Sequence, residues 1–331
     1  MKVVLAAFTV CCMLLAAACK TPEPISAVQS FGVDCQPLST LSWMKTYPQQ
    51  LNGGDLRIRV GVKSPGGTPK GDILFLHGFA DRIDNHQPLF DSWAAAGFRV
   101  LAFDFPSHGE TCGSNSNIDH FGFTDLADIA KYVESSTLED TNRPLLLAGW
   151  STGGLLAVRM LQSSTFPSMS RPIKGAILFA PGVSVYSLVG ESGSVTQASL
   201  TNNPSPPHYG TITPGSPLHK PLFATKLLTN AQLSWQQQYP EDKRTLVIVA
   251  DDDQDMYAKS ADLRGWVASQ RTSTAVKILG VQCAGAKHEL DNEPAPIGPQ
   301  VRKLATAFAL TVVDANAPAI GSLVTPPCGS F

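Results

Sequence analysis

The order of apolar and polar residues along the chain predicts strands that alternate with helices. Largely uninterrupted apolar runs are typical of strands buried on both faces, and they occur at residues 72–76, 98–105, 145–148, 175–180 and 245–250. Two further strands are expected at 55–63, where apolar and polar residues alternate as in a half-exposed edge strand, and at 275–281. Helical spacing of apolar residues is found at 86–96, 125–135, 155–159, 257–269 and 298–312. This alternation predicts an α/β fold with a mostly parallel sheet and helices on both faces.

The alternation of strands and helices is interrupted once, over residues 183–243. This stretch holds no buried strand and contains five prolines within 204–217, followed by an expected helix at 222–237. We interpret it as a cap inserted over the carboxyl edge of the sheet. The core then comprises 51–182 and 244–314, with an N-terminal arm (19–50) lying over the sheet and a C-terminal tail (315–331).

Length and composition fit one large domain with an insertion. The chain has 331 residues, of which 43% are hydrophobic and 16% charged, so it can bury a sizeable core. The formal net charge is −2 and no basic run is present. Nucleic acid is therefore excluded as a partner.

The first residues have the features of an export signal. Lys2 is followed by an apolar stretch and by small residues up to residue 18, which predicts a signal peptide over 1–18. Cys19 follows directly, so Leu15–Cys19 is similar to a bacterial lipobox, in which the cysteine is lipidated and attaches the protein to a membrane. We expect a lipoprotein of the periplasm or outer membrane, with ordinary secretion as the alternative.

Four cysteines follow this signal: Cys35, Cys112, Cys283 and Cys328. An even number in an exported chain indicates two disulfides, with three connectivities open, although four free thiols are the alternative. None of the spacings is C-x-x-C, which disfavours a zinc site.

A candidate nucleophile follows the apolar run at 145–148. Gly149–Gly153 matches G-x-S-x-G, a strand-to-helix turn that presents its serine, here Ser151, at the end of a sheet. A serine hydroxyl needs a base, and the base needs an orienting acid. In this fold the acid and then the histidine come from the ends of later strands. His288 and an acidic cluster at 251–255 lie at those positions.

Five segments together resemble the α/β-hydrolase superfamily, in the branch of monoacylglycerol lipases, lysophospholipases and serine aminopeptidases. They are 77–81, 103–109, 149–153, 250–253 and 286–290, and the resemblance spans residues 71–312. It implies Asp253 as the orienting acid, with Asp252 and Asp255 as alternatives. It also implies an oxyanion hole formed by the backbone N–H groups of Phe79 and Thr152.

The sequence also gives expectations for Trp150 and for the remaining histidines. His77 and His108 are expected to brace loops of the site, whereas His86, His120, His208 and His219 are expected on the surface or in the cap. Trp150 either lines an acyl pocket or packs under the nucleophile turn, and we favour packing.

The sequence as a whole predicts a serine hydrolase of carboxylic esters that uses Ser151, His288 and Asp253 and requires no cofactor or metal. The expected substrate is a small or lipid ester, such as a monoacylglycerol, a lysophospholipid or a short acyl ester. A peptidase or amidase with the same triad is the first alternative. A non-catalytic binding protein on the same fold is the second.

Overall fold

A computed structural model describes the protein from residue 44 onward, with gaps. The described residues are 44–51 and 54–331 except 114–115, 185–199, 205–219, 252–254, 256, 272–275, 315 and 318; for 44–51, 54 and 55 only the backbone is described. The expected signal peptide, Cys19 and most of the N-terminal arm lie outside these residues.

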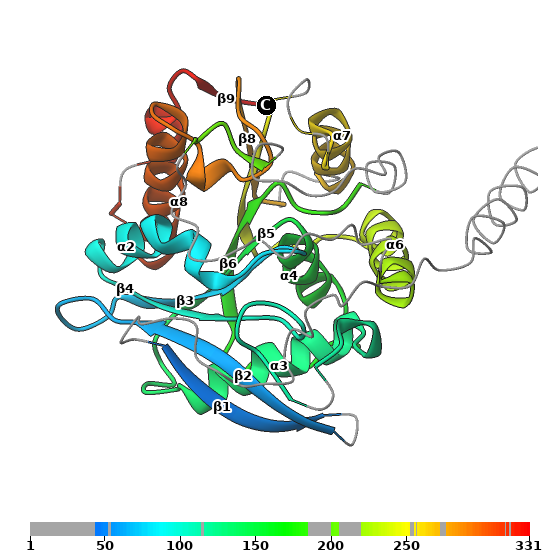
Figure 1. Ribbon diagram of the computed structural model, residues 1–331. Helices are drawn as coiled ribbons and strands as arrows, with labels where there is room; N and C mark the ends of the chain where they lie inside the picture. The colour runs from blue at the N-terminus through cyan, green and yellow to red at the C-terminus, as the bar shows by residue number, and fades with distance from the viewer. Residues whose placement is uncertain are drawn as a thin grey trace, which may run out of the picture. The chain divides into compact units, whose positions relative to one another are not determined.

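In the described part of the chain, nine strands form one sheet in the order β1-β2-β4-β3-β5-β6-β7-β8-β9 (Figure 1). The strands are β1 (Met44–Leu51), β2 (Gly54–Lys63), β3 (Gly71–Leu76), β4 (Phe98–Phe103), β5 (Leu145–Trp150), β6 (Ile173–Phe179), β7 (Arg244–Val249), β8 (Ile278–Cys283) and β9 (Cys328–Ser330). The six strands from β4 to β8 in this order are parallel, whereas β1, β2 and β9 run antiparallel to their neighbours. The predicted α/β-hydrolase architecture is confirmed.

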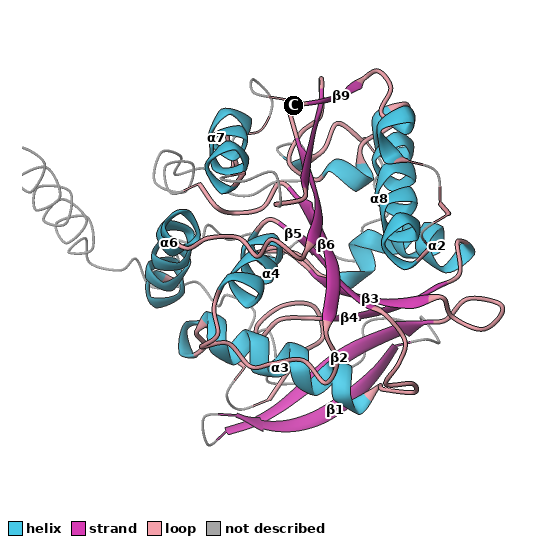
Figure 2. Cartoon of the chain, turned by 180° about the vertical axis from the view of Figure 1, so that it is seen from behind, coloured by secondary structure: helices cyan, strands magenta, loops and turns pink. Residues whose placement is uncertain are grey.

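Helices cover both faces of the sheet (Figure 2). They are α2 (Gln87–Ala95), α3 (Phe123–Ser136), α4 (Thr152–Gln162), α6 (Pro221–Gln236), α7 (Ser260–Gln270) and α8 (Ile297–Val313). Helices α2 and α8 pack together on one face, and α3 and α4 pack on the other. Each residue of β3, β4 and β5 is buried, as their continuous apolar character predicts.

The edges of the sheet differ from the expectation. Residues 44–51 do not lie over the sheet but extend it, because β1 pairs with β2 along its whole length. The segment 55–63 is therefore not an edge strand, and Arg59 on its polar face is buried against Asp84 and Asp104. At the opposite edge β9 pairs with β8, and a Cys283–Cys328 disulfide joins the two strands.

The stretch interpreted as a cap, residues 183–243, is described in part. Helix α6 confirms the helix expected near 222–237, and it packs against α4. In the part of the chain that the structure describes, no helix is long and apolar enough to cross a membrane.

Candidate active site

Ser151 lies in a strained turn between β5 and α4. Its φ of 53° and ψ of −115° fall in a region that L-residues rarely adopt. A Cβ atom on Gly149 would lie 2.4 Å from the carbonyl oxygen of Gly153, and one on Gly153 would lie 2.0 Å from that of Leu76. Only glycine fits at either position, so the G-x-S-x-G spacing reflects the close approach of strand and helix.

The Ser151 hydroxyl is within hydrogen-bond distance of His288, with 2.8 Å between Oγ and Nε2. On the other side of the ring, His288 Nδ1 lies 2.9 Å from Asp255 Oδ2. Asp255 Oδ1 in turn accepts from the backbone N–H groups of Tyr257 and Ala258. This network assigns the proton of neutral His288 to Nδ1, so that Nε2 can accept from the serine.

The carboxylate beside His288 is thus Asp255, which the resemblance ranked behind Asp253. Asp253 and the other alternative, Asp252, lie outside the described residues. The family spacing places the acid three residues past Ala250, and in this chain the carboxylate that meets the histidine lies two residues further along the loop.

Asp251 ties the loop of the acid to the loop of the histidine. Its backbone N–H donates to the carbonyl of Ala286, and its carboxylate accepts from the backbone N–H of Gly285. These bonds join the segments that follow β7 and β8, and they account for the meeting of Asp255 and His288.

The loop after β3 holds the backbone of Phe79 in a fixed orientation. His77 Nδ1 lies 2.7 Å from the carbonyl oxygen of Gly78, and His77 Nε2 accepts from the backbone N–H of Phe105 at 2.8 Å. Because C=O and N–H of a trans peptide point in opposite directions, the hold on the Gly78 carbonyl fixes the direction of the Phe79 N–H. No group among the described residues accepts from this N–H.

His108 secures the next peptide of the same loop. Its Nε2 accepts from the backbone N–H of Ala80, and its Nδ1 donates to the carbonyl of Pro106. Burial lowers the pKa of His108 to about 4 and also lowers that of His77. Both rings are neutral near pH 7, and the expectation that they brace the site is confirmed.

Trp150 combines packing with a hydrogen bond that the sequence did not suggest. Its ring is buried and lies 5.1 Å from the His288 ring, in agreement with the packing role. Its Nε1 also donates to the backbone carbonyl of His288 at 2.8 Å. The residue before the serine therefore fixes the loop that carries the histidine.

A largely apolar pocket opens beside Ser151. It is lined by Phe79, Trp150, Ser151, Thr152, Gly182, Leu200, Leu227, Tyr257, Ala258 and His288. Thr152 is the first residue of α4, so its N–H belongs to the unpaired first turn of that helix. The two expected oxyanion donors, on Phe79 and Thr152, thus belong to residues that border the same pocket as the serine.

The expectation for His86 is wrong. The ring is fully buried, with one nitrogen 2.8 Å from Asp81 and the other 2.8 Å from Asp291. The apolar pattern could not place it inside, because its burial depends on carboxylates more than 200 residues apart. His120, which was expected in the same class, is exposed, whereas His208 and His219 lie outside the described residues.

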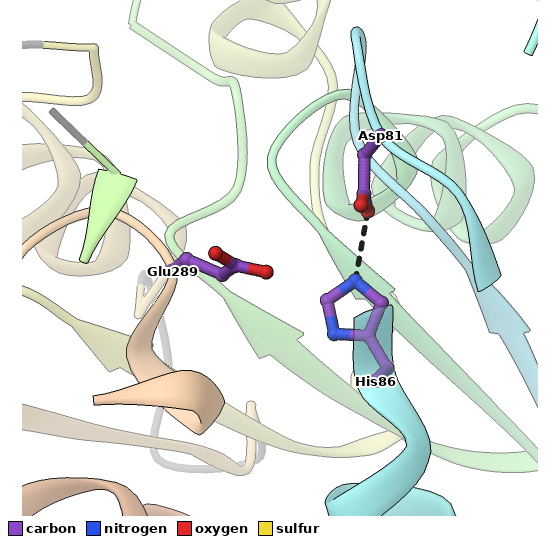
Figure 3. Close-up of side chains that lie close together, drawn as sticks. All are labelled: Asp81, His86 and Glu289. Atoms are coloured by element: carbon purple, nitrogen blue, oxygen red, sulfur yellow. Dashed lines mark hydrogen bonds and ion pairs between the residues drawn. The ribbon is translucent and has the colours of Figure 1, made fainter. Parts of the chain in front are cut away.

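One group of described side chains has the composition of a metal site. The candidate ligand atoms of Asp81, His86 and Glu289 all lie within 4.8 Å of one another (Figure 3). Each ring nitrogen of His86, however, lies at hydrogen-bond distance from a carboxylate oxygen. The arrangement is that of a charged hydrogen-bond network.

The disulfide expectation is confirmed in part. Cys283 pairs with Cys328, and Cys112 also forms a disulfide, with a partner outside the described residues.

A profile of the family described as serine aminopeptidase, S33, matches residues 67–254, more than half of the chain. The matched range contains Ser151 and ends just before Asp255. The monoacylglycerol lipase of Mycolicibacterium smegmatis is 26% identical over 108 residues, which are 30% of this chain and 36% of that protein. The monoglyceride lipase of Homo sapiens is 28% identical over 94 residues, 28% of this chain and 31% of that protein. The chain thus spans about a third of the length of these curated relatives.

Solved structures resemble the fold over most of the chain. A soluble variant of the monoglyceride lipase of Saccharomyces cerevisiae, in complex with a substrate analogue, has a TM-score of 0.61 at 16% identity, covering 90% of this chain and all of that one. The monoacylglycerol lipase of Paleococcus ferrophilus has a TM-score of 0.58 at 17% identity, covering 77% and 99%. At these identities the likeness concerns the fold. Together with the family profile, it establishes that the chain belongs to the serine aminopeptidase S33 family of α/β-hydrolases.

Proposed function

We propose that the protein is a serine hydrolase of carboxylic esters, with Ser151 as nucleophile, His288 as general base and Asp255 as the orienting acid. The observation that carries the proposal is the continuous hydrogen-bond chain from Ser151 Oγ through both nitrogens of His288 to Asp255. This is the arrangement that activates a serine at neutral pH.

In the proposed acylation step, Ser151 Oγ attacks the ester carbonyl carbon while its proton passes to His288 Nε2. The carbonyl oxygen becomes an oxyanion, which accepts from the N–H groups of Phe79 and Thr152. The imidazolium of His288 is stabilised by Asp255. The C–O bond to the alcohol then breaks, and the alcohol leaves with the proton from His288.

Deacylation repeats these steps with water. His288 removes a proton from a water molecule, whose oxygen attacks the acyl-serine carbonyl. Collapse of the second tetrahedral intermediate breaks the bond to Ser151 Oγ, which recovers its proton from His288. The carboxylic acid leaves and the free enzyme is restored, so every proton is balanced within the triad.

We further propose that the substrate is lipid-like, a monoacylglycerol or lysophospholipid, or else a short acyl ester. The pocket at Ser151 is bordered by aromatic and aliphatic side chains, which suits an acyl chain better than a charged group. The names of the curated relatives, both lipases of monoacylglycerols, support the same class.

The test is hydrolysis of p-nitrophenyl esters from C2 to C16, with monoacylglycerol and lysophospholipid alongside, by wild type and Ser151→Ala. We expect activity that disappears in the variant while its melting temperature stays within a few degrees. Activity retained by Ser151→Ala would contradict the nucleophile assignment. A maximum at long chains would support the lipid substrate, and a maximum at C2 to C4 the short ester.

A second candidate, favoured by the description of the family as serine aminopeptidases, is hydrolysis of an aminoacyl amide by the same triad. Aminoacyl amides assayed beside the matching esters would separate the two. If neither the amides nor the esters are hydrolysed, and a fluorophosphonate does not label Ser151 in folded protein, the non-catalytic binding protein is favoured.

We also propose that the protein is exported, with residues 1–18 as signal peptide and Cys19 as the lipidated residue. The Cys283–Cys328 disulfide supports an oxidising compartment. Mass spectrometry of the mature N-terminus would identify a lipid on Cys19, and an unmodified N-terminus would favour secretion.

A further inference from the structure

A buried charged cluster joins the two loops that border the candidate triad. Asp81 lies in the loop that carries Phe79, and His86 ends the short 3₁₀ helix η1 (Ile83–His86) that follows it. Asp291 lies in a second 3₁₀ helix, η4 (Leu290–Asn292), three residues after His288. All three side chains of the cluster are almost fully buried.

His86 lies between the two carboxylates and donates to both. Its Nε2 is 2.8 Å from Asp81 Oδ2, and its Nδ1 is 2.8 Å from Asp291 Oδ2. The dashed line in Figure 3 marks the contact with Asp81. An ionised carboxylate only accepts, so two ionised partners require a proton on each ring nitrogen, which makes the ring an imidazolium. Burial disfavours this charge, but the attraction of Asp291 and Asp81 outweighs burial and raises the pKa of His86 well above its usual value.

The neighbouring groups favour a proton over a metal ion in this cluster. Burial, with Asp81 nearby, raises the pKa of Glu289 well above its ordinary value, which favours the neutral form of this third carboxyl. Asn292 Nδ2 donates to Glu289 Oε1 at 2.6 Å. Among the described residues, Arg302 is a further charged group packed here, and it donates to the backbone carbonyl of Asp291. A metal would need a lone pair on His86, and an imidazolium ring offers none.

The cluster fixes both loops through their backbones. Asp81 Oδ2 also accepts from the backbone N–H of Gly78 at 3.4 Å, and its Oδ1 accepts from Asn85 Nδ2 at 2.7 Å. From the histidine side, Asn292 Nδ2 donates to the backbone carbonyl of Asn85 at 2.8 Å. Two separate ties therefore connect the loop of Phe79 to the loop of His288.

We propose that His86 is a positioning residue for hydrolysis: its doubly donating ring holds the oxyanion donor on Phe79 in register with the base His288. This inference rests on the proposed function. The His86 ring also lies 5.7 Å from the Trp150 ring, and Trp150 Nε1 donates to the His288 carbonyl. The rings of His86, Trp150 and His288 thus form one packed group, with Trp150 in the middle.

Replacing His86 by a neutral side chain leaves two buried carboxylates with no cation between them. Such groups relax by separating or by taking up a proton, and in either case the two loops lose their common anchor. A misplacement of catalytic groups by about 1 Å can lower kcat by about 100-fold. The three cluster residues do not line the pocket, so we expect little change in KM.

The test compares wild type, His86→Gln and a matched control, Glu134→Gln. Glu134 is fully buried and forms an ion pair of 2.9 Å with Arg171, which precedes β6, away from the site. We expect His86→Gln to lower kcat about 10- to 100-fold with KM within about threefold. Glu134→Gln should lower the melting temperature to a similar extent and keep kcat within about twofold.

A second readout does not depend on hydrolysis. In ¹⁵N NMR at pH 8, assigned by comparison with His86→Gln, both ring nitrogens of His86 should have the shifts of an imidazolium. A neutral ring, or one equivalent of zinc bound by wild type and lost in His86→Gln, would overturn the proposal. So would a folded His86→Gln with the kcat of wild type.

If His86→Gln does not fold, Asp291→Asn takes its place. The asparagine keeps an acceptor for His86 Nδ1 and removes one charge, and kcat should fall in the same direction; an unchanged kcat would overturn the proposal. Wild type that is inert on every ester, with an intact imidazolium signal, would instead mean that the proposed function fails.

Discussion

At the scale of single residues, the site depends on a few side chains whose partners are distant in sequence. Ser151 and His288 could be predicted because a short motif and the order of strands fix their places. Asp255 could only be narrowed to an acidic cluster, since the length of the loop after β7 decides which carboxylate meets the ring. His86 was missed, because its burial depends on two carboxylates that no local pattern connects.

Asp255→Asn tests the assignment of the acid. An amide in this position can hold the His288 ring in the wrong tautomer and does not stabilise its cation, so kcat should fall by about 10²- to 10⁴-fold. Asp253→Asn is the comparison, and it should keep kcat within about threefold. Steady-state kinetics on a p-nitrophenyl ester measure both, and the reverse ranking would restore Asp253.

Trp150→Phe tests the hydrogen bond to the histidine loop. Phenylalanine preserves most of the packing but removes the Nε1 donor, so the buried carbonyl of His288 loses its partner. We expect a loss of about 1–3 kcal/mol in the free energy of unfolding and a several-fold lower kcat. Urea unfolding and kinetics on one preparation provide the measurement. A variant with the unfolding free energy and the kcat of wild type would show that Trp150 acts through packing alone.

At the scale of elements, the interior of the sheet could be predicted and its edges could not. Continuous apolar runs identify β3, β4 and β5, because burial on both faces leaves no other pattern. The strand β1 carries no such signal, and β9 has only three residues. Both strands form because they pair with a neighbouring strand, and the local sequence pattern does not show which segment that neighbour is.

Helix α6, in the stretch interpreted as a cap, contacts the candidate oxyanion loop through aromatic rings. Phe223 stacks on Phe79 at 5.7 Å between centroids and on Phe123 of α3 at 6.1 Å, and Leu227 of the same helix lines the pocket. Phe223→Ala should therefore raise KM for a C12 ester several-fold more than for an acetate. The two esters are compared on one protein, and equal effects on both would show that α6 does not shape the acyl site.

At the scale of the whole molecule, the C-terminal tail is part of the fold. The Cys283–Cys328 disulfide closes a loop with a sequence separation of 45 residues and holds β9 on β8. Replacing both cysteines by serine should lower the free energy of unfolding by about 2–4 kcal/mol. Urea denaturation of the variant measures this loss. An unchanged midpoint would show that the tail contributes little to stability.

Buried histidines make the stability of the molecule depend on pH in opposite directions. The folded-state pKa of His108 is about 4, below the unfolded value near 6.5, so its contribution is complete above pH 6.5 and is lost as pH falls toward 4. The pKa of His86 is raised instead, so its contribution is complete below pH 6.5 and is lost as pH rises. Each slope is at most about 1.4 kcal/mol per pH unit.

Urea unfolding of wild type from pH 4.5 to 9 should therefore show a loss of stability on both sides of a maximum. The difference between wild type and a variant isolates one group at a time. His86→Gln should make the alkaline limb less steep, because one proton that only the folded state binds there is gone, whereas Glu289, whose pKa is also raised, keeps its own contribution. His108→Gln should make the acid limb less steep, whereas His77, whose pKa burial also lowers, keeps its own contribution to that limb. An alkaline limb that persists unchanged in His86→Gln would show that the ring between Asp81 and Asp291 is not the group that holds this proton.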